Sequence, residues 1–161
     1  MQQETCSFAD PRANILGWRC YDFKEEFANE RRGFEEFETN RIKSLIPETG
    51  IELIPEKSYI LEFNFEKING VDFKKGCYIG QENTARMKLK NKLRRRLLPI
   101  SSTEKLNLGE EIFYDKIKIG KILIEKPYPF GLVKLIDPNV EEFQNKELLV
   151  NNKKCKILKS V

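Results

Sequence analysis

The feature that most constrains the fold is a succession of short apolar segments in the C-terminal part of the sequence, each bounded by turn residues. The candidate strands are Lys92 to Ile100, Glu111 to Tyr114, Ile117 to Ile124, Gly131 to Ile136 and Leu148 to Leu158. The turn signals between them are Leu108-Gly109, Asp115-Lys116, Pro127-Tyr128-Pro129 and Asp137-Pro138-Asn139. Short strands separated in this way are typical of a small antiparallel β-barrel. We therefore expect residues 91–161 to form a C-terminal β-barrel domain.

The preceding residues, 1–90, mix helical and loop signals. A β-rich run extends from Ile15 to Tyr21, and apolar residues spaced three to five apart predict an amphipathic helix from Arg31 to Ile46, stopped by the proline that follows. Residues Gly50 to Asn64 lack a sustained period, so we expect a loop there, with one short strand at Ser58 to Phe63. The sequence thus predicts an α+β chain in two parts.

Composition excludes several classes of site. The 161 residues include no histidine, so this chain alone cannot build Ser-His-Asp or Cys-His catalysis, a histidine-containing zinc site or a histidine-ligated haem. No apolar run approaches the ~20 residues of a membrane span, and the first residues do not resemble a signal peptide. The four cysteines form no C-x-x-C pair. We therefore expect a reducing, cytoplasmic location and no membrane partner.

The segment from Lys75 to Glu82 is the candidate for chemistry. Cys77 lies just after two lysines, and residues 81–89 have good helix propensity. Cationic neighbours and a helix N-terminus both favour the thiolate, which is the nucleophilic and metal-binding form of cysteine. The flanking Gly76 and Gly80 allow positive φ or close backbone approach. A lone cysteine is also often a small buried apolar residue, so the residues alone leave both interpretations open.

The run K-G-C-Y-I-G-Q-E closely resembles the signature of the YgfZ family of folate-binding proteins. These proteins are relatives of the glycine-cleavage aminomethyltransferase and assist iron–sulfur cluster proteins. The motif residues are Lys75, Gly76, Cys77, Tyr78, Gly80, Gln81 and Glu82, with Arg86 four residues further on. Other stretches resemble family elements in the same order: Asp10-Pro11-Arg12 with Leu16 to Arg19, Arg41-Ile42 with Ile46 to Gly50, Leu61 to Phe65, Arg94 to Leu97, and Gly131-Leu132.

The resemblance implies a folate-shaped cavity with the reactive thiol of Cys77 near its rim and Lys75 beside it. By similarity, Arg41 would pair with the anionic end of a bound tetrahydrofolate, as a guanidinium does with a carboxylate. Glu62 would accept hydrogen bonds from the pterin. The residue types alone are equally compatible with a solvated Arg41 on a helix surface and an ordinary surface carboxylate at Glu62.

The chain departs from the family pattern in three places. Family members are considerably longer, so residues 1–90 resemble only the second half of a folate-binding domain. We expect the N-terminal half to come from missing sequence or from another chain. Leu45 stands where the family usually has glycine, and Ile60 replaces a proline.

The expected function is a folate-binding accessory protein that supports the assembly or repair of iron–sulfur enzymes, including tRNA-modifying ones. Its partners would be folate and iron–sulfur client or assembly proteins. One cysteine cannot hold a cluster alone, so we expect no stably bound metal and at most transient ligation by Cys77.

Two other functions stay open. One is a folate-dependent aminomethyl or one-carbon transferase. The other is a nucleic-acid-binding module that uses the basic run from Lys88 to Arg96. Within a strand, Arg94 and Arg96 share one face while Arg95 points to the other, which favours a solvated barrel exterior.

Overall fold

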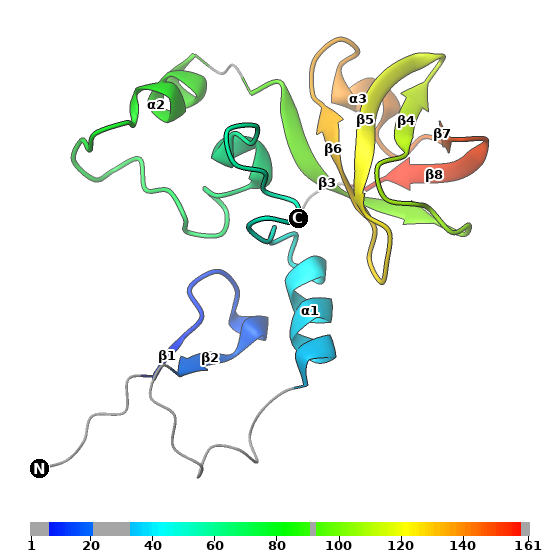
Figure 1. Ribbon diagram of the computed structural model, residues 1–161. Coiled ribbons are helices and arrows are strands. Elements are labelled where there is room, and N and C mark those ends of the chain that lie inside the picture. Colours follow the sequence, from blue (N-terminus) through cyan, green and yellow to red (C-terminus); the bar gives the residue numbers. More distant parts are fainter. Residues whose placement is uncertain (1–6, 21–32, 91–92, 159–161) are drawn as a thin grey trace, which may run out of the picture.

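The computed structural model describes residues 7–20, 33–90 and 93–158. They form an α+β chain that ends in a closed antiparallel β-barrel, so the predicted fold class is confirmed (Figure 1). Around the barrel the strand order is β3-β6-β5-β4-β7-β8, and β8 returns to β3. The bounds are β3 Arg95–Ser102, β4 Glu111–Tyr114, β5 Ile117–Ile124, β6 Phe130–Lys134, β7 Leu148–Val150 and β8 Lys153–Ile157. Lys92, the expected first residue of this region, lies outside the described residues.

Apolar side chains fill the inside of the barrel because alternate residues of a strand point to the same side. The fully buried members are Leu106, Ile112, Ile119, Ile122, Val133, Phe143, Leu148, Val150 and Ile157. Phe143 comes from α3 (Val140–Phe143), a short helix that the sequence analysis missed. Asn139 caps it, and the Glu142 side chain bonds back to the Asn139 N–H in a capping box.

Two glycines let β5 and β6 approach closely. A Cβ atom at Gly120 would lie 2.6 Å from the carbonyl oxygen of Leu132, and one at Gly131 would lie 2.6 Å from that of Lys121. Both distances are too short for a real side chain, so the pairing of these strands requires glycine at both positions.

The predicted strands at β4 and β5 are confirmed at both ends, but the single strand expected from Leu148 to Leu158 is wrong. This segment folds into the β7–β8 hairpin, whose turn residues Asn151 and Asn152 have φ of 47° and 67°. Two consecutive positive φ values are typical of the tight type I′ hairpin turn, in which asparagine is well tolerated. The barrel therefore has six strands instead of the five expected.

The N-terminal hairpin joins β1 (Ser7–Ala9) to β2 (Trp18–Cys20) through the 3₁₀ helix η1 (Asn14–Leu16). The β-run expected from Ile15 is strand only from Trp18, because the first residues of that run are helical. The buried Asp10 carboxylate accepts hydrogen bonds from Arg12 and Arg19. These bonds, led by that of Arg12, hold its pKa well below the usual value despite burial.

Helix α1 spans Phe34–Lys43, so it is shorter than the Arg31 to Ile46 expected; the first two expected residues lie outside the described part. Its C-terminal end is a Schellman motif. Leu45 N–H donates to the Ile42 carbonyl (3.0 Å), and Ile46 N–H donates to the Arg41 carbonyl (3.1 Å). Leu45 has φ of 54°, a left-handed position that normally favours glycine. The helix thus ends before the proline.

The segment expected as a strand at Ser58 to Phe63 is instead the 3₁₀ helix η3 (Ile60–Phe63), so that prediction is wrong. Asn64 ends η3 with a φ of 63°, and its side-chain amide donates to the carbonyl of Leu97 on β3 (3.0 Å). The polar link and the left-handed cap favour a helical turn over an extended strand here. The helix predicted over residues 81–89 is confirmed as α2 (Glu82–Leu89).

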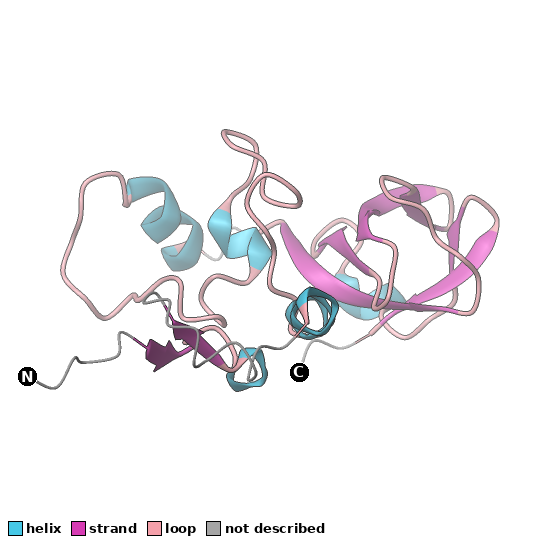
Figure 2. Cartoon of the chain, turned by 60° about the horizontal axis from the view of Figure 1, so that its bottom comes forward, coloured by secondary structure: helices cyan, strands magenta, loops and turns pink. Residues whose placement is uncertain are grey.

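The parts are joined by apolar contacts. Ile42 and Phe63 pack against Leu97, Phe130 and Leu132 on the barrel. A second cluster of Leu16, Ile46 and Ile68 ties the N-terminal hairpin to the segment after α1. Figures 1 and 2 agree that η3 lies between the barrel and α2, which is on the far side from the barrel. Of the helices described, none is long and apolar enough to cross a bilayer.

Candidate functional site

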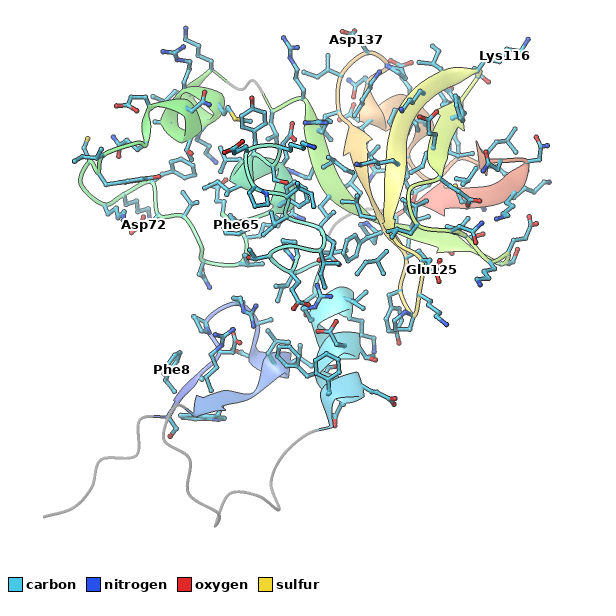
Figure 3. All side chains as sticks on the ribbon, viewed as in Figure 1. Phe8, Phe65, Asp72, Lys116, Glu125 and Asp137 are labelled. Carbon is cyan, nitrogen blue, oxygen red and sulfur yellow. The ribbon has the colours of Figure 1, made fainter. Side chains whose placement is uncertain are left out.

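Cys77 lies in an exposed loop directly before α2, as predicted. All residues from 72 to 80 are exposed, Cys77 included. Figure 3 shows this loop, marked by Asp72, running along the outer side of the molecule away from the barrel. Gly80 has φ of 88°, and the side-chain oxygen of Gln81 accepts a hydrogen bond from the Tyr78 N–H (3.0 Å). The motif glycine and glutamine therefore shape the bend that presents the cysteine.

The two lysines before the cysteine have local contacts. The Lys75 ammonium lies 5.0 Å from the centre of the Tyr78 ring, and the Lys74 N–H donates to the Asp72 carboxylate (2.7 Å). The cation–π contact therefore holds the Lys75 side chain against Tyr78, the residue that follows Cys77. This places a cation next to the thiol-bearing residue in sequence and on the same exposed loop.

Helix α2 adds nothing to the buried core, since none of its residues is buried. Its attachment includes Lys88, whose ammonium lies 2.5 and 2.8 Å from the two carboxylate oxygens of Glu66 and 5.2 Å from the centre of the Phe73 ring. Ile79 is fully exposed, and 85% of Leu89 is exposed. Large apolar side chains left in water around a motif are typical of a surface that a partner covers. We call residues 72–90 the motif unit.

A pocket of about 270 Å³ separates the motif unit from η3. Its lining residues are Ser58, Tyr59, Ile60, Leu61, Tyr78, Gly80, Asn83, Thr84 and Met87. The hydroxyl and amide groups on an otherwise apolar wall are the usual make-up of a small-molecule site, although the volume is at the low end for one. The motif therefore borders a pocket through Tyr78 and Gly80, and neither Arg41 nor Glu62 lines it.

Arg41 is buried at the end of α1 in a cluster of carboxylates. Its guanidinium donates to Glu38 (3.0 and 2.8 Å), to Glu52 (3.2 Å) and to the carbonyl of Ile46 (2.7 Å). The more exposed Glu48 lies 3.6 Å away. Burial opposes its charge, but the bonds to Glu38 and the charge of Glu52 outweigh burial and raise the pKa of Arg41. These contacts of Arg41 with Ile46 and Glu52 hold the loop after α1 in place.

Glu62 is buried on η3 and is paired with Arg95 on β3. Arg95 Nε donates to Oε1 (3.1 Å), and Nη2 lies 2.9 Å from Oε2 without hydrogen-bond alignment. Asn64, on the same turn, has a buried side-chain oxygen with no hydrogen-bond partner among the described residues. Two buried acceptors on η3 therefore have unused capacity. The sequence analysis did not single out Asn64, although it stands in the segment that carries the family resemblance.

Two cations of the basic run form ion pairs on different elements. Lys88 on α2 is paired with Glu66, and Arg95 on β3 is paired with Glu62. Arg86 is exposed on α2, and Lys92 lies outside the described residues. The structure therefore adds no observation that favours the nucleic-acid alternative.

No group of three or more acidic or cysteine side chains in the described part is arranged to hold a metal ion. Cys155 is buried in the barrel core, and burial raises the pKa of its thiol to about 11. Cys6 and the side chain of Cys20 lie outside what the structure describes. Of the described cysteines, only Cys77 is therefore accessible to a partner.

The fold and site define an α+β chain in which a closed barrel supports a lobe that exposes a motif cysteine. Comparison with curated proteins finds relatives named as iron–sulfur cluster assembly factors. The chain is 38% identical over 100 residues to the mouse mitochondrial factor IBA57, 32% over 134 residues to the homologue from Dictyostelium discoideum, and 38% over 95 residues to the human protein. No family model matches the chain.

These alignments take in 60, 75 and 56% of this chain but only 28, 33 and 27% of the respective relatives. The chain thus spans about a third or less of their length. Its homologues are iron–sulfur assembly factors, which supports the broader relationship inferred from the motif; the narrower YgfZ-type designation stays a prediction. The relatives are named mitochondrial, so the expected cytoplasmic location is wrong and the comparison points to mitochondria.

Proposed function

We propose that this chain is an accessory factor in iron–sulfur cluster assembly that presents Cys77 as its working thiol. The observation that carries the proposal is the exposure of Cys77 on a motif unit with no buried helical residue. The names of the relatives support the same role. In this arrangement the barrel and η3 hold the motif unit, and the unit meets an assembly protein or a client enzyme, including tRNA-modifying ones.

The chemistry follows from the single thiol. A thiolate binds iron, and common clusters take about four protein ligands, so Cys77 supplies one ligand while a partner or small thiols supply the others. The iron–sulfur cluster is therefore bound transiently, as the substrate that is transferred. The exposed Tyr78 and Ile79, which directly follow Cys77, would be covered when the partner docks, which gives the contact an apolar component.

Folate binding is the finer part of the proposal. A pterin offers amino and ring N–H donors, and the carboxylate of Glu62 and the free oxygen of Asn64 are acceptors of matching chemistry on one turn. A folate carboxylate would reach Arg41 by replacing Glu48, the most exposed and most distant of its carboxylate neighbours. When bound, folate would supply a one-carbon or redox-active group. The protein residues bind and orient it.

The experiment replaces the endogenous gene with the Cys77→Ser variant and measures the activities of several iron–sulfur enzymes, one of them tRNA-modifying. We expect these activities to fall to the level of the deletion, with unchanged far-ultraviolet circular dichroism and urea midpoint. Lys121→Met, an exposed position on β5 outside the motif unit, is the control and should support normal activity. Full activity with Cys77→Ser would overturn the proposal.

Folate binding has its own measurement. Equilibrium dialysis of tetrahydrofolate against the full chain should show binding that Glu62→Gln and Asn64→Leu each weaken. Cys77→Ser should leave it unchanged. Binding that ignores both η3 variants would reject the pterin assignment and leave the role of the thiol intact.

A further inference from the structure

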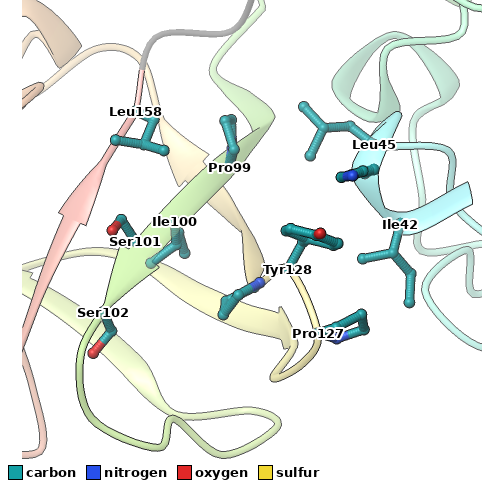
Figure 4. A pocket seen from close by; sticks show the side chains of 11 residues that line it. Ile42, Leu45, Pro99, Ile100, Ser101, Ser102, Pro127, Tyr128 and Leu158 are labelled. Carbon is teal, nitrogen blue, oxygen red and sulfur yellow. The ribbon is translucent and has the colours of Figure 1, made fainter. Parts of the chain in front are cut away.

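A second pocket, of about 330 Å³, lies between the end of α1 and the barrel (Figure 4). Its lining residues are Ile42, Lys43, Leu45, Pro99, Ile100, Ser101, Ser102, Pro127, Tyr128, Pro129 and Leu158. None of them belongs to the motif unit or to the pocket beside it. Figure 4 shows Ile42 and Leu45 facing Tyr128 and Pro99 across the opening. The pocket is therefore a separate hollow with walls from both parts of the chain.

The walls are mostly apolar and partly in contact with water. Three prolines contribute rings to the surface, and Tyr128 and Leu158 remain 42% and 40% exposed. A ligand that covered these side chains would be stabilised in proportion to the apolar surface removed from water. The volume reaches the lower bound of small-molecule sites, so the ligand that fits is small.

Leu45 forms one wall at a cost to its backbone. Its φ of 54° is strained for any residue with a Cβ atom, and glycine would avoid the strain. Its side chain lines the pocket and packs against the apolar cluster that includes Ile42 and Phe63. A leucine at a strained position where glycine would fit indicates that its side chain contributes packing or binding. Here it closes the pocket on the α1 side.

Lys43 carries the only formal charge among the lining residues. Its ammonium lies 4.9 Å from the centre of the Tyr128 ring, and in the part of the chain that the structure describes no carboxylate forms an ion pair with it. An exposed cation–π contact is weaker than a hydrogen bond to a charged group. A ligand carboxylate would therefore draw Lys43 toward itself.

We propose that this pocket binds a small organic acid with an aromatic or branched aliphatic body and one carboxylate. The body lies against Leu45, Pro99 and Leu158, and the carboxylate accepts hydrogen bonds from the Lys43 ammonium. The inference does not depend on the role of Cys77.

The test is a nuclear magnetic resonance titration of the ¹⁵N-labelled full chain with three compounds of nearly equal shape. Phenylacetate is the acid, 2-phenylethanol the neutral analogue and phenethylamine the cation. We expect phenylacetate to shift the amide signals of Ile100 to Ser102 and of Tyr128, and to bind about tenfold more tightly than the alcohol. Phenethylamine should bind most weakly, because Lys43 repels it.

Variants separate the charge from the walls. Lys43→Met should bring phenylacetate down to the affinity of the alcohol. Lys146→Met is the matched control, because Lys146 makes the same contact 5.6 Å from the ring of Tyr114, outside the pocket, and should change nothing. Leu45→Gly suits the backbone but opens the wall, and Ser101→Phe fills the hollow from the exposed side of β3, so both should abolish the shifts.

The proposal is overturned if phenylacetate causes no shifts at these residues, if the three compounds bind equally, or if Lys43→Met leaves phenylacetate binding unchanged. Displacement of phenylacetate by tetrahydrofolate at these same residues would assign the hollow to folate and also reject a separate ligand.

Discussion

Arg95 on β3 covers the buried carboxylate of Glu62 on η3, with 2.9 Å between Nη2 and Oε2. The Glu62 side chain is 4% exposed, whereas 42% of the Arg95 side chain faces water. This pair and the bond from the Asn64 side chain to the Leu97 carbonyl both link the η3 turn to the barrel. Because η3 also lines the pocket beside the motif unit, the Arg95–Glu62 pair connects the barrel to one wall of that pocket.

Loss of Arg95 should therefore destabilise the chain more than loss of an exposed pair. Arg95→Met leaves a buried carboxylate unpaired, which we expect to cost about 1–3 kcal/mol in urea unfolding. The control, Lys88→Met, breaks the pair with Glu66, in which both side chains are about half exposed, and should cost at most about 1 kcal/mol. Equal losses would show that Glu62 is solvated.

The two described cysteines should differ in reactivity. We expect Cys77 in a single-cysteine variant to react with iodoacetamide at least about tenfold faster than Cys155 in its own single-cysteine variant, because Cys77 is exposed. Burial raises the pKa of the Cys155 thiol from 9.0 to about 11, which keeps it protonated. Urea should abolish the difference. A fast Cys155 in the folded chain would contradict the barrel core.

Glu110 should contribute stability that depends on acidity. The Asn107 backbone N–H, the Asn107 side chain and Lys153 bond to its carboxylate and lower its pKa from 4.5 to about 2. A lowered folded pKa stabilises the fold above the unfolded value. The stability lost in Glu110→Gln should therefore be greatest above pH 4.5 and should shrink as the pH falls toward 2.

Urea midpoints measured across this pH range provide the check. Glu111→Gln is the control, because Glu111 is a surface residue paired with Lys118 across the β4–β5 hairpin. Its effect should be small and nearly flat. A pH-independent Glu110→Gln effect would argue against the network.

The β7–β8 turn should accept glycine at its second central position. Asn152 has φ of 67°, and Asn-Gly is the preferred sequence of a type I′ turn, so Asn152→Gly should stabilise the chain by up to about 1 kcal/mol. Asn152→Val, which resists positive φ, should destabilise it. Thermal unfolding of both variants measures the difference, and a stabilising valine would refute the turn assignment.

The barrel is predictable because turn signals containing Gly, Pro or Asp separate its apolar strands. For β4 and β5 the predicted first and last residues agree with the structure. The β7–β8 hairpin was missed because Asn151-Asn152 lies inside one apolar-rich run and lacks glycine or proline. The expected strand at η3 failed for a different reason. Its β-rich residues are held in a helical turn by Asn64 bonding to β3, which is a tertiary contact with no local signal.

The site divides in the same way. The position of Cys77 before α2 follows from local propensity and was predicted correctly. The surroundings of Arg41 and Glu62 depend on which distant side chains fold against them, and no spacing in the sequence indicates that Glu52 and Arg95 are those partners. Their proposed contacts with folate stay predictions.

The uninterrupted exposure of residues 72–80 has a practical consequence. Lys74 and Lys75 offer trypsin two adjacent cleavage points on a loop outside the packed core, while the barrel strands are closed on one another. Among the described residues we therefore expect an early cut there, which leaves α2 and the barrel together on the C-terminal fragment. A true partner would be recognised without labels or mutations, simply because its arrival shields those two bonds from digestion.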